Sequence, residues 1–335
     1  MVRIDKITIV GAGAIGGTMA AYMARAGVPV HLVDANAAHV AAVRKGGLRI
    51  KAANEEFRVN VPADTPESYE GALRYVFLAT KAPHTEEAMR WIAPRLAEDG
   101  WVLSTQNGLN EPLIAREIGE PRAIGCFINF FADLIEDGTI SYGGPGAFVI
   151  GELDGRLTER MQALRERLKH FIDPVLTTNI WGYLWSKLAY GAVLFATATT
   201  DETMADCVDH PQYRAALRKL GLEVVGLAHL RGLTLEPFDG WDPNALADGQ
   251  AANTMFDGVS RMMRNNLKVR SGVWRDLAVH HRKTEIDSQY GPVLQLAQEC
   301  DYRMPALKRL VQIVHELESG SRRRDLSNLE SLLNA

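Results

Sequence analysis

The feature that most constrains this chain is a glycine-rich turn near its start, Gly11-Ala12-Gly13-Ala14-Ile15-Gly16. An apolar, β-branched run at 6–10 precedes the turn, and a helical pattern follows it at once. The G-x-G-x-x-G dinucleotide fingerprint requires this context of strand, turn and helix. Its first glycine allows the tight turn, its second lets the backbone approach a pyrophosphate, and its third lets the helix pack on the strand. The helix N-terminus then offers N–H groups to the phosphates.

Asp34 stands at the end of the second apolar run, 28–34. An acid at this distance after the glycines hydrogen-bonds the adenosine ribose in dinucleotide-binding domains. A carboxylate there repels the 2′-phosphate of NADP, so Asp34 favours NAD(H). Two alternatives stay open: Asp34 could be an ordinary acid at the start of a loop, and Arg44, Lys45 or Arg49 could meet a phosphate and admit NADP(H).

Composition excludes several classes of function. A length of 335 residues predicts about two domains. The composition, with 47% hydrophobic and 23% charged residues, is ordinary for a globular protein with a full core. A formal net charge of -4 gives no basic face for nucleic acid. Cys126, Cys207 and Cys300 are too far apart for a disulfide framework or a metal site, which predicts reduced thiols and a cytoplasmic protein. No signal peptide and no membrane span are expected.

The pattern of elements changes along the chain. Short apolar strands alternate with helices in the first half, which predicts an α/β fold with a parallel sheet. We expect a small hairpin or an edge insertion at 48–50 and 57–61, and antiparallel closing strands of the sheet at 124–131, 139–142 and 147–151. Beyond about residue 178, helical periodicity dominates. The sequence therefore predicts a Rossmann dinucleotide-binding domain at 1–176 and a helical domain at 177–335.

Within the second domain, apolar periodicity predicts five helical stretches. They cover 180–198, 212–231, 254–268, 277–300 and a last helix at 305–318. The polar, basic residues 319–324 that follow are expected to be solvated. An apolar helical domain of this kind is compatible with a homodimer.

Lys81 and Asn107 follow two predicted strands, 75–80 and 101–105. Open α/β sheets bind ligands at the carboxyl ends of their strands. We therefore expect both side chains to contact cofactor or substrate, although a polar residue in such a turn can also be a helix cap.

Five motifs in order resemble the ketopantoate reductase family (2-dehydropantoate 2-reductases) along nearly the whole chain. They are Gly11–Gly16, Thr80-Lys81, Gln106-Asn107-Gly108, Trp185-Ser186-Lys187-Leu188 and Thr284-Glu285-Ile286-Asp287. The resemblance implies a Rossmann domain followed by an all-α domain of the 6-phosphogluconate dehydrogenase-like type, which makes 177–335 a substrate or dimerisation domain. It also implies NAD(P)H-dependent reduction of a 2-oxo acid to a 2-hydroxy acid, ketopantoate to pantoate being the named candidate.

The same resemblance assigns roles to single residues. Lys187 matches the catalytic lysine, a general acid, and Glu285 matches the glutamate that holds the substrate hydroxyl. Asn107 and Lys81 match residues that face nicotinamide and substrate, and Ser271 matches a serine that holds the substrate carboxylate. Hydride delivery to a carbonyl leaves an alkoxide, which a nearby ammonium can stabilise and protonate. The alternatives are a surface lysine at 187 and a solvated helix face at 285.

The chain also departs from the family. Where ketopantoate reductases usually carry asparagines one and two turns after the lysine, this chain has Gly191 and Phe195. These changes remove hydrogen bonds and put pantoate itself in doubt. A bulkier 2-oxo acid, an opine- or imine-type dehydrogenase and a non-catalytic nucleotide-binding regulator therefore remain alternatives. The pair His280-His281 does not predict a metal site, because consecutive residues do not share a helix face.

Overall fold

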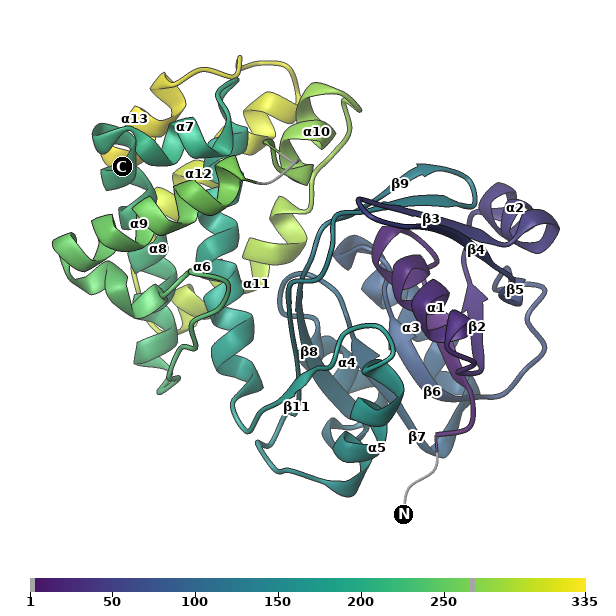
Figure 1. The fold of residues 1–335 in the computed structure, drawn as a ribbon. Helices are drawn as coiled ribbons and strands as arrows, with labels where there is room; N and C mark the ends of the chain where they lie inside the picture. Colours follow the sequence, from purple (N-terminus) through teal and green to yellow (C-terminus); the bar gives the residue numbers. More distant parts are fainter. Residues whose placement is uncertain (1–3, 266–268) are drawn as a thin grey trace. The chain divides into compact units, whose positions relative to one another are not determined.

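The computed structural model describes residues 4–265 and 269–335. The chain divides into two compact units at Ile180/Trp181 (Figure 1). The boundary expected from composition, 176/177, lies a few residues earlier, and β12 (Val175–Leu176) still pairs with the first unit's sheet.

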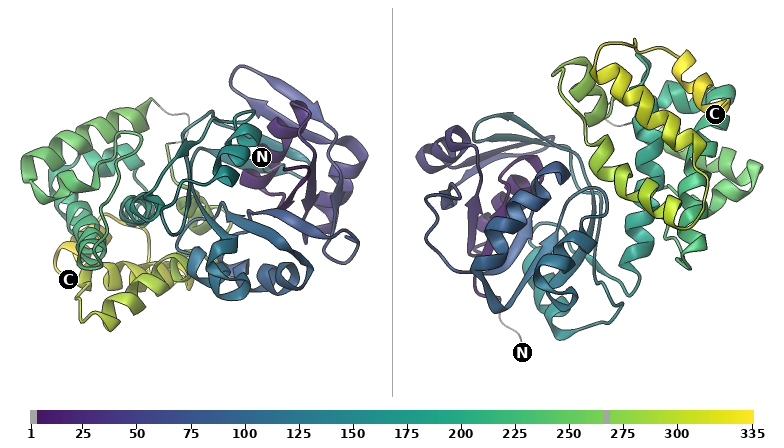
Figure 2. Two further views of the ribbon diagram at one scale, coloured as in Figure 1. Left: turned by 90° about the horizontal axis from the view of Figure 1, so that it is seen from below. Right: turned by 180° about the vertical axis from the view of Figure 1, so that it is seen from behind.

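The first unit is built on an eight-stranded sheet with the order β12-β11-β8-β7-β6-β1-β2-β5. Neighbouring strands run parallel except β8 and β11. Figure 2, seen from behind, shows α3 (Thr85–Ile92) and α4 (Glu111–Ile118) on the face opposite α1 (Ala14–Arg25). The remaining strands of this sheet are β1 (Ile7–Val10), β2 (Val30–Val33), β5 (Ala63–Asp64), β6 (Leu73–Leu78), β7 (Leu96–Ser104), β8 (Ala123–Asn129) and β11 (Ala147–Glu152).

A second sheet of four strands packs on the other side of α1. Its order is β4-β3-β10-β9, with β3 (Leu48–Ala52), β4 (Glu56–Val59), β9 (Ala132–Glu136) and β10 (Thr139–Tyr142). Because α1 contacts strands of both sheets, it is buried along most of its length. A Cβ at Gly17 would stand less than 3.0 Å from Ile140 Cδ1 and from Ala12 O, so α1 packs closely on β10 and on the glycine turn at this position.

The expectation of three antiparallel closing strands was wrong in two respects. Strand β8 pairs parallel with β7, and β10 belongs to the second sheet, where it runs parallel to β3. Strand β11 pairs antiparallel with β8, and the edge strand β12 runs parallel to β11. The sequence pattern specifies that these segments are extended but carries no signal for their partners, which depend on contacts distant in the chain.

The second unit is helical. Helices α6 (Ile180–Ala198) and α12 (Pro305–Glu318) match their predicted ranges. The Glu223 carboxylate accepts from Ala306 N and Leu307 N, both at 2.9 Å, and so caps α12 from within the core. The other helices are α7 (Met204–Asp209), α8 (Pro211–Leu230), α9 (Gly249–Arg264), α10 (Gly272–Ala278), α11 (Ile286–Glu299) and α13 (Ser327–Leu333).

The single helical stretch expected at 277–300 was wrong, because a break separates α10 from α11. His281 has a φ of 48° there, and Arg282 turns back to donate to Asp276 Oδ1 at 2.8 Å. Helices α7 and α13 were not predicted, so α12 is not the last helix. The end of the predicted stretch 254–268 lies outside the described residues. Among the helices that are described, none is long and apolar enough to cross a membrane.

Candidate active site

Four segments of the first unit meet at one edge of its sheet. Strands β2, β1, β6 and β7 are consecutive, parallel neighbours, so their carboxyl ends lie side by side. These ends carry, in turn, Asp34, the glycine turn, Lys81 and Asn107. The strand order reverses at β1, and in open α/β sheets ligands bind at such a switch point.

The glycine turn is shaped by two close approaches. Gly11 has a φ of 100°, and its N–H donates to Val33 O at 2.8 Å, which ties the turn to β2. A Cβ at Gly16 would collide with the Gly11 carbonyl oxygen, so the first turn of α1 packs directly on this backbone. At Gly13, by contrast, a Cβ would meet no atom within 4 Å. The turn is therefore open on the side of Gly13, where a phosphate could approach the α1 N-terminus.

Asp34 holds the turn from the end of β2. Its Oδ2 accepts from Ala12 N at 2.6 Å, and its Oδ1 accepts from Asn36 N at 2.8 Å. Each carboxylate oxygen can accept a further hydrogen bond, and Asp34 is only partly buried. The carboxylate thus stands at the turn with capacity left for a ribose hydroxyl.

Two of the three cations that could have met a 2′-phosphate are engaged by carboxylates. Arg44 donates to Ala63 O at 2.6 Å and pairs with Asp64. Arg49 Nε donates to Glu56 Oε1 at 2.6 Å. Both guanidinium groups are therefore bound to carboxylates of the first unit.

A buried hydrogen-bond chain, which sequence reasoning missed, joins the loops after β6 and β7. Gln106 Nε2 donates to Thr80 O at 3.0 Å and to Thr85 Oγ1 at 2.8 Å. Thr85 Oγ1 donates to Asn110 Oδ1 at 3.0 Å, and Asn110 Nδ2 donates to Asn107 O at 2.8 Å. These hydrogen bonds fix the backbone on either side of Lys81 and at Asn107. The side chains of Lys81 and Asn107 are themselves exposed. The Q-N-G motif contained the signal, since its glutamine lies beside the predicted site residue.

We expect Gln106→Leu to lower the free energy of unfolding by about 1–3 kcal/mol, because it leaves Thr80 O and Thr85 Oγ1, both in the segment after β6, without this donor. Urea unfolding followed by circular dichroism measures this. The matched control is Gln212→Leu at an exposed glutamine, for which a change of about 0.5 kcal/mol or less is expected. Equal losses in the two variants would show that the chain of bonds does not stabilise the loops.

The second unit carries Lys187 and Glu285 on two connected helices. Lys187 lies on α6 and is half-buried, and Glu285 is the N-cap residue of α11. Tyr290 Oη on α11 donates to Leu188 O at 2.9 Å, which joins α11 to α6 one residue from Lys187. Glu285 lies at the start of α11 and is partly buried.

Thr284 and Ser271 each hold the start of a helix. Thr284 donates to Glu318 Oε1 through N and through Oγ1, each at 2.7 Å, which fixes the start of α11 on the end of α12. Ser271 is buried, and its Oγ accepts from Trp274 N at 3.2 Å as the N-cap of α10. The hydroxyl proton of Ser271 can still be donated to a ligand.

The two departures from the family pattern share one neighbour, Tyr290. The Tyr290 Oη lies 2.8 Å from where a Gly191 Cβ would stand. The Phe195 ring packs edge-on against Tyr290, with centroids 5.6 Å apart and an interplanar angle of 89°. An asparagine at 191 would therefore displace Tyr290, and Phe195 is buried beside it.

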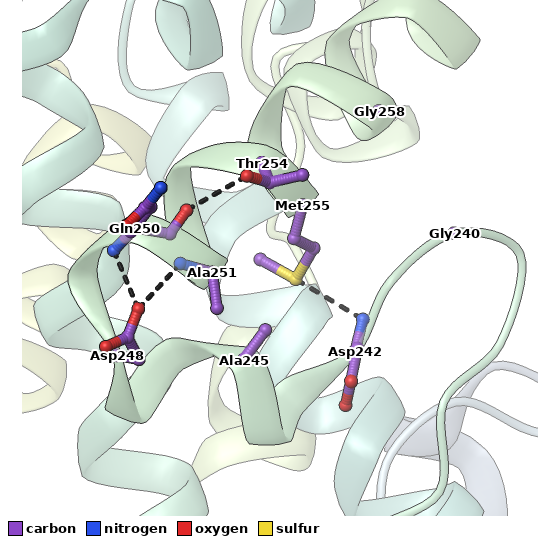
Figure 3. A pocket seen from close by; sticks show the side chains of 9 residues that line it. All are labelled: Gly240, Asp242, Ala245, Asp248, Gln250, Ala251, Thr254, Met255 and Gly258. Carbon is purple, nitrogen blue, oxygen red and sulfur yellow. Dashed lines mark hydrogen bonds between the residues drawn. The ribbon is translucent and has the colours of Figure 1, made fainter.

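An open cavity of about 600 Å³ lies elsewhere in the helical unit (Figure 3). The carboxylates of Asp242 and Asp248 at its wall accept from the backbone N–H groups of Asn244, Gln250 and Ala251. No predicted site residue lines it, so it is separate from the candidate site. Among the described residues, no cluster of His, Cys, Asp and Glu could hold a metal ion. The cavity is lined by Gly240, Asp242, Ala245, Asp248, Gln250, Ala251, Thr254, Met255 and Gly258.

The parallel sheet with its glycine turn, followed by a helical unit, defines a two-domain protein of the Rossmann class. The chain belongs to the ketopantoate reductase family. The family model for ketopantoate reductase PanE/ApbA matches residues 7–155, and the model for its C-terminal domain matches residues 179–318.

Individual relatives are similar over nearly their full length. A 2-dehydropantoate 2-reductase of Mesorhizobium japonicum is 29% identical, over 93% of this chain and 97% of the relative. The Pyrococcus horikoshii enzyme of the same name is 26% identical, over 95% and 100%. A solved ketopantoate reductase structure from Ralstonia eutropha JMP134 is 25% identical, with a TM-score of 0.78 over 94% and 99%. D-mandelate dehydrogenase with NADH and anilino(oxo)acetate shares the fold, at 22% identity and a TM-score of 0.82 over 94% and 99%.

Proposed function

We propose that this protein reduces a 2-oxo acid to the 2-hydroxy acid with a nicotinamide dinucleotide, and that 2-dehydropantoate is the first candidate substrate. The observation that carries the proposal is family membership across both domains, together with relatives named 2-dehydropantoate 2-reductase. The open Gly13 backbone and the Asp34 carboxylate fit a dinucleotide at the sheet edge.

Each proposed site residue has a chemical task. When bound, the reduced cofactor supplies the hydride. The Gly11–Gly16 turn holds the phosphates through the backbone N–H groups of Ala14, Ile15 and Gly16, and Asp34 holds the ribose. Lys81 and Asn107 would contact nicotinamide and substrate from the strand ends.

In the second unit, Lys187 Nζ donates the proton that the developing alkoxide takes up, and its positive charge stabilises that oxygen beforehand. Glu285 accepts a hydrogen bond from the resulting hydroxyl, and Ser271 donates to the substrate carboxylate. The positive charge of Lys187 would thus stabilise the oxygen on which negative charge develops.

We further propose that NADH is preferred to NADPH. Asp34 would repel a 2′-phosphate, and Arg44 and Arg49 already face acids of their own. The cofactor preference is therefore expected to follow the carboxylate at position 34.

A bulkier, more apolar 2-oxo acid is the second candidate substrate. The observation that favours it is the aromatic pair Phe195 and Tyr290 beside Gly191, where relatives would carry amide side chains. The Phe195 ring offers no hydrogen bond to the substrate hydroxyl of 2-dehydropantoate, and the Tyr290 hydroxyl proton is already donated to Leu188 O.

Steady-state reduction of 2-dehydropantoate and of phenylglyoxylate, each with NADH and NADPH, tests both candidates. A kcat/KM above about 10⁴ M⁻¹ s⁻¹ for one of them would identify the substrate class. Tight nucleotide binding without turnover of any 2-oxo acid would instead favour a nucleotide-binding regulator.

A further inference from the structure

His39 is a buried imidazole that belongs to no predicted role. It lies in α2 (Ala37–Gly46), and only 1% of its surface is exposed. Its Nε2 lies 3.0 Å from the carbonyl oxygen of Ala12, the second residue of the glycine turn. Its Nδ1 lies 3.1 Å from Gly138 N, at the turn between β9 and β10. One side chain thus connects the glycine turn to the second sheet.

The partners of the ring determine its tautomer. A backbone N–H can only donate, so Nδ1 must accept from Gly138 and carries no proton. A carbonyl oxygen can only accept, so Nε2 carries the proton and donates it to Ala12 O. The carboxylate of Asp137 also faces the ring, with Oδ1 3.7 Å from Nδ1. In this geometry His39 is a neutral imidazole with both nitrogens in use.

Ala12 is consequently held at both of its backbone polar groups. Asp34 Oδ2 accepts from Ala12 N at 2.6 Å, while His39 donates to Ala12 O. The two holding side chains are themselves linked, because Asn36 N donates to Asp34 Oδ1 and Asn36 Oδ1 accepts from His39 N at 3.2 Å. These contacts close a ring from Ala12 through Asp34, Asn36 and His39 back to Ala12.

We propose that His39 is a positioning residue for the dinucleotide. By fixing the Ala12 carbonyl, His39 orients the peptide group between Ala12 and Gly13. The N–H of this group belongs to Gly13, at the open side of the turn. A turn that is ordered before the ligand arrives loses less conformational entropy on binding. The inference rests on the proposed function only in assuming that the turn binds a nicotinamide dinucleotide.

A pair of amide variants separates the two contacts of the ring. His39→Gln places an amide N–H near the position of Nε2 and can still donate to Ala12 O. His39→Asn is shorter, reaches only the position of Nδ1, and leaves Ala12 O without its donor. We expect NADH affinity near that of the native protein for His39→Gln and about tenfold weaker for His39→Asn. Isothermal titration with NADH measures both, and thermal unfolding reports the stability of each variant.

The values of kcat and KM distinguish a loss of dinucleotide positioning from a general loss of folded structure. At saturating NADH, both variants should keep the native kcat and the native KM for the oxo acid. Equal NADH affinity in His39→Asn and the native protein would overturn the proposal, as would equally weak binding in the two variants. If the native protein itself binds neither NADH nor NADPH, the proposed function fails, and that outcome is separate from a failure of His39.

The native protein provides a second test that needs no variant. Long-range ¹H–¹⁵N NMR correlations should show His39 neutral, with Nε2 protonated and Nδ1 bare, at neutral pH. The Nε2–H signal should shift when NADH is added. A proton on Nδ1, or an Nε2–H signal unmoved by saturating NADH, would contradict the assignment even if both variants fail to fold.

Discussion

Replacing Lys187 with alanine is expected to lower kcat for the preferred 2-oxo acid by about 10²–10⁴-fold, the range typical for loss of a general acid. NADH binding should be unchanged, because the glycine turn and Asp34 lie in the other unit. The measurement is steady-state kinetics beside isothermal titration with NADH. The matched control is Lys308→Ala, at an exposed lysine on α12, which should leave kcat unaltered.

Lys187→Arg separates the two tasks of this residue. Arginine keeps the positive charge but does not release a proton in proteins, so it can stabilise the alkoxide without donating to it. We expect Lys187→Arg to remain well below the native kcat. Native turnover in either variant would contradict the role of Lys187 as general acid.

The second large effect is expected at Asp34. Asp34→Ala should weaken NADH binding by about 10–100-fold, because a charge-assisted hydrogen bond contributes about 1.5–3 kcal/mol. NADPH binding should weaken far less, because the same change removes a repulsion from the 2′-phosphate. Titrations with both nucleotides therefore measure a change in the ratio of their affinities.

Asp34 also holds Ala12 N and Asn36 N, so part of the loss of NADH affinity could come from the turn itself. Asp34→Asn helps to separate the two causes, since it keeps a carbonyl acceptor but removes the charge. Asp99→Asn, at an exposed acid of the same unit, is the matched control and should bind both nucleotides as the native protein does. An unchanged NADH to NADPH ratio in both Asp34 variants would contradict the assignment.

The part of the fold with a strong local pattern was predictable from the sequence. The strand–turn–helix at residues 7–25 has the order that the glycine motif predicts, and the long helix α6 has its predicted limits. The partners of β8 and β10 were not predictable, because pairing depends on distant strands. The break at His281 was missed for a similar reason: a contact between Arg282 and Asp276 turns the chain back.

Residues of the candidate site were predictable from the sequence only where the residue type itself indicates a chemical role. Gly11, Asp34, Lys81 and Asn107 follow strands, and the sheet edge collects them. His39 acts through backbone atoms of segments far away in sequence, so its residue type alone gave no indication of its contacts. Gln106 stands in a motif that the sequence singled out, but its contacts with Thr80 and Thr85 are evident only in the fold. Tyr290 likewise explains Gly191 and Phe195 only once α11 is placed on α6.

The most direct test of hydride transfer to a 2-oxo acid is an isotope experiment. NADH carrying deuterium at both C4 positions of the nicotinamide is mixed with the enzyme and 2-dehydropantoate, or with phenylglyoxylate if that is the better substrate. The account predicts one deuterium at C2 of the 2-hydroxy acid, detected by mass spectrometry and NMR. A 2-hydroxy acid without deuterium, or no product from either acid while NADH is bound, would contradict it.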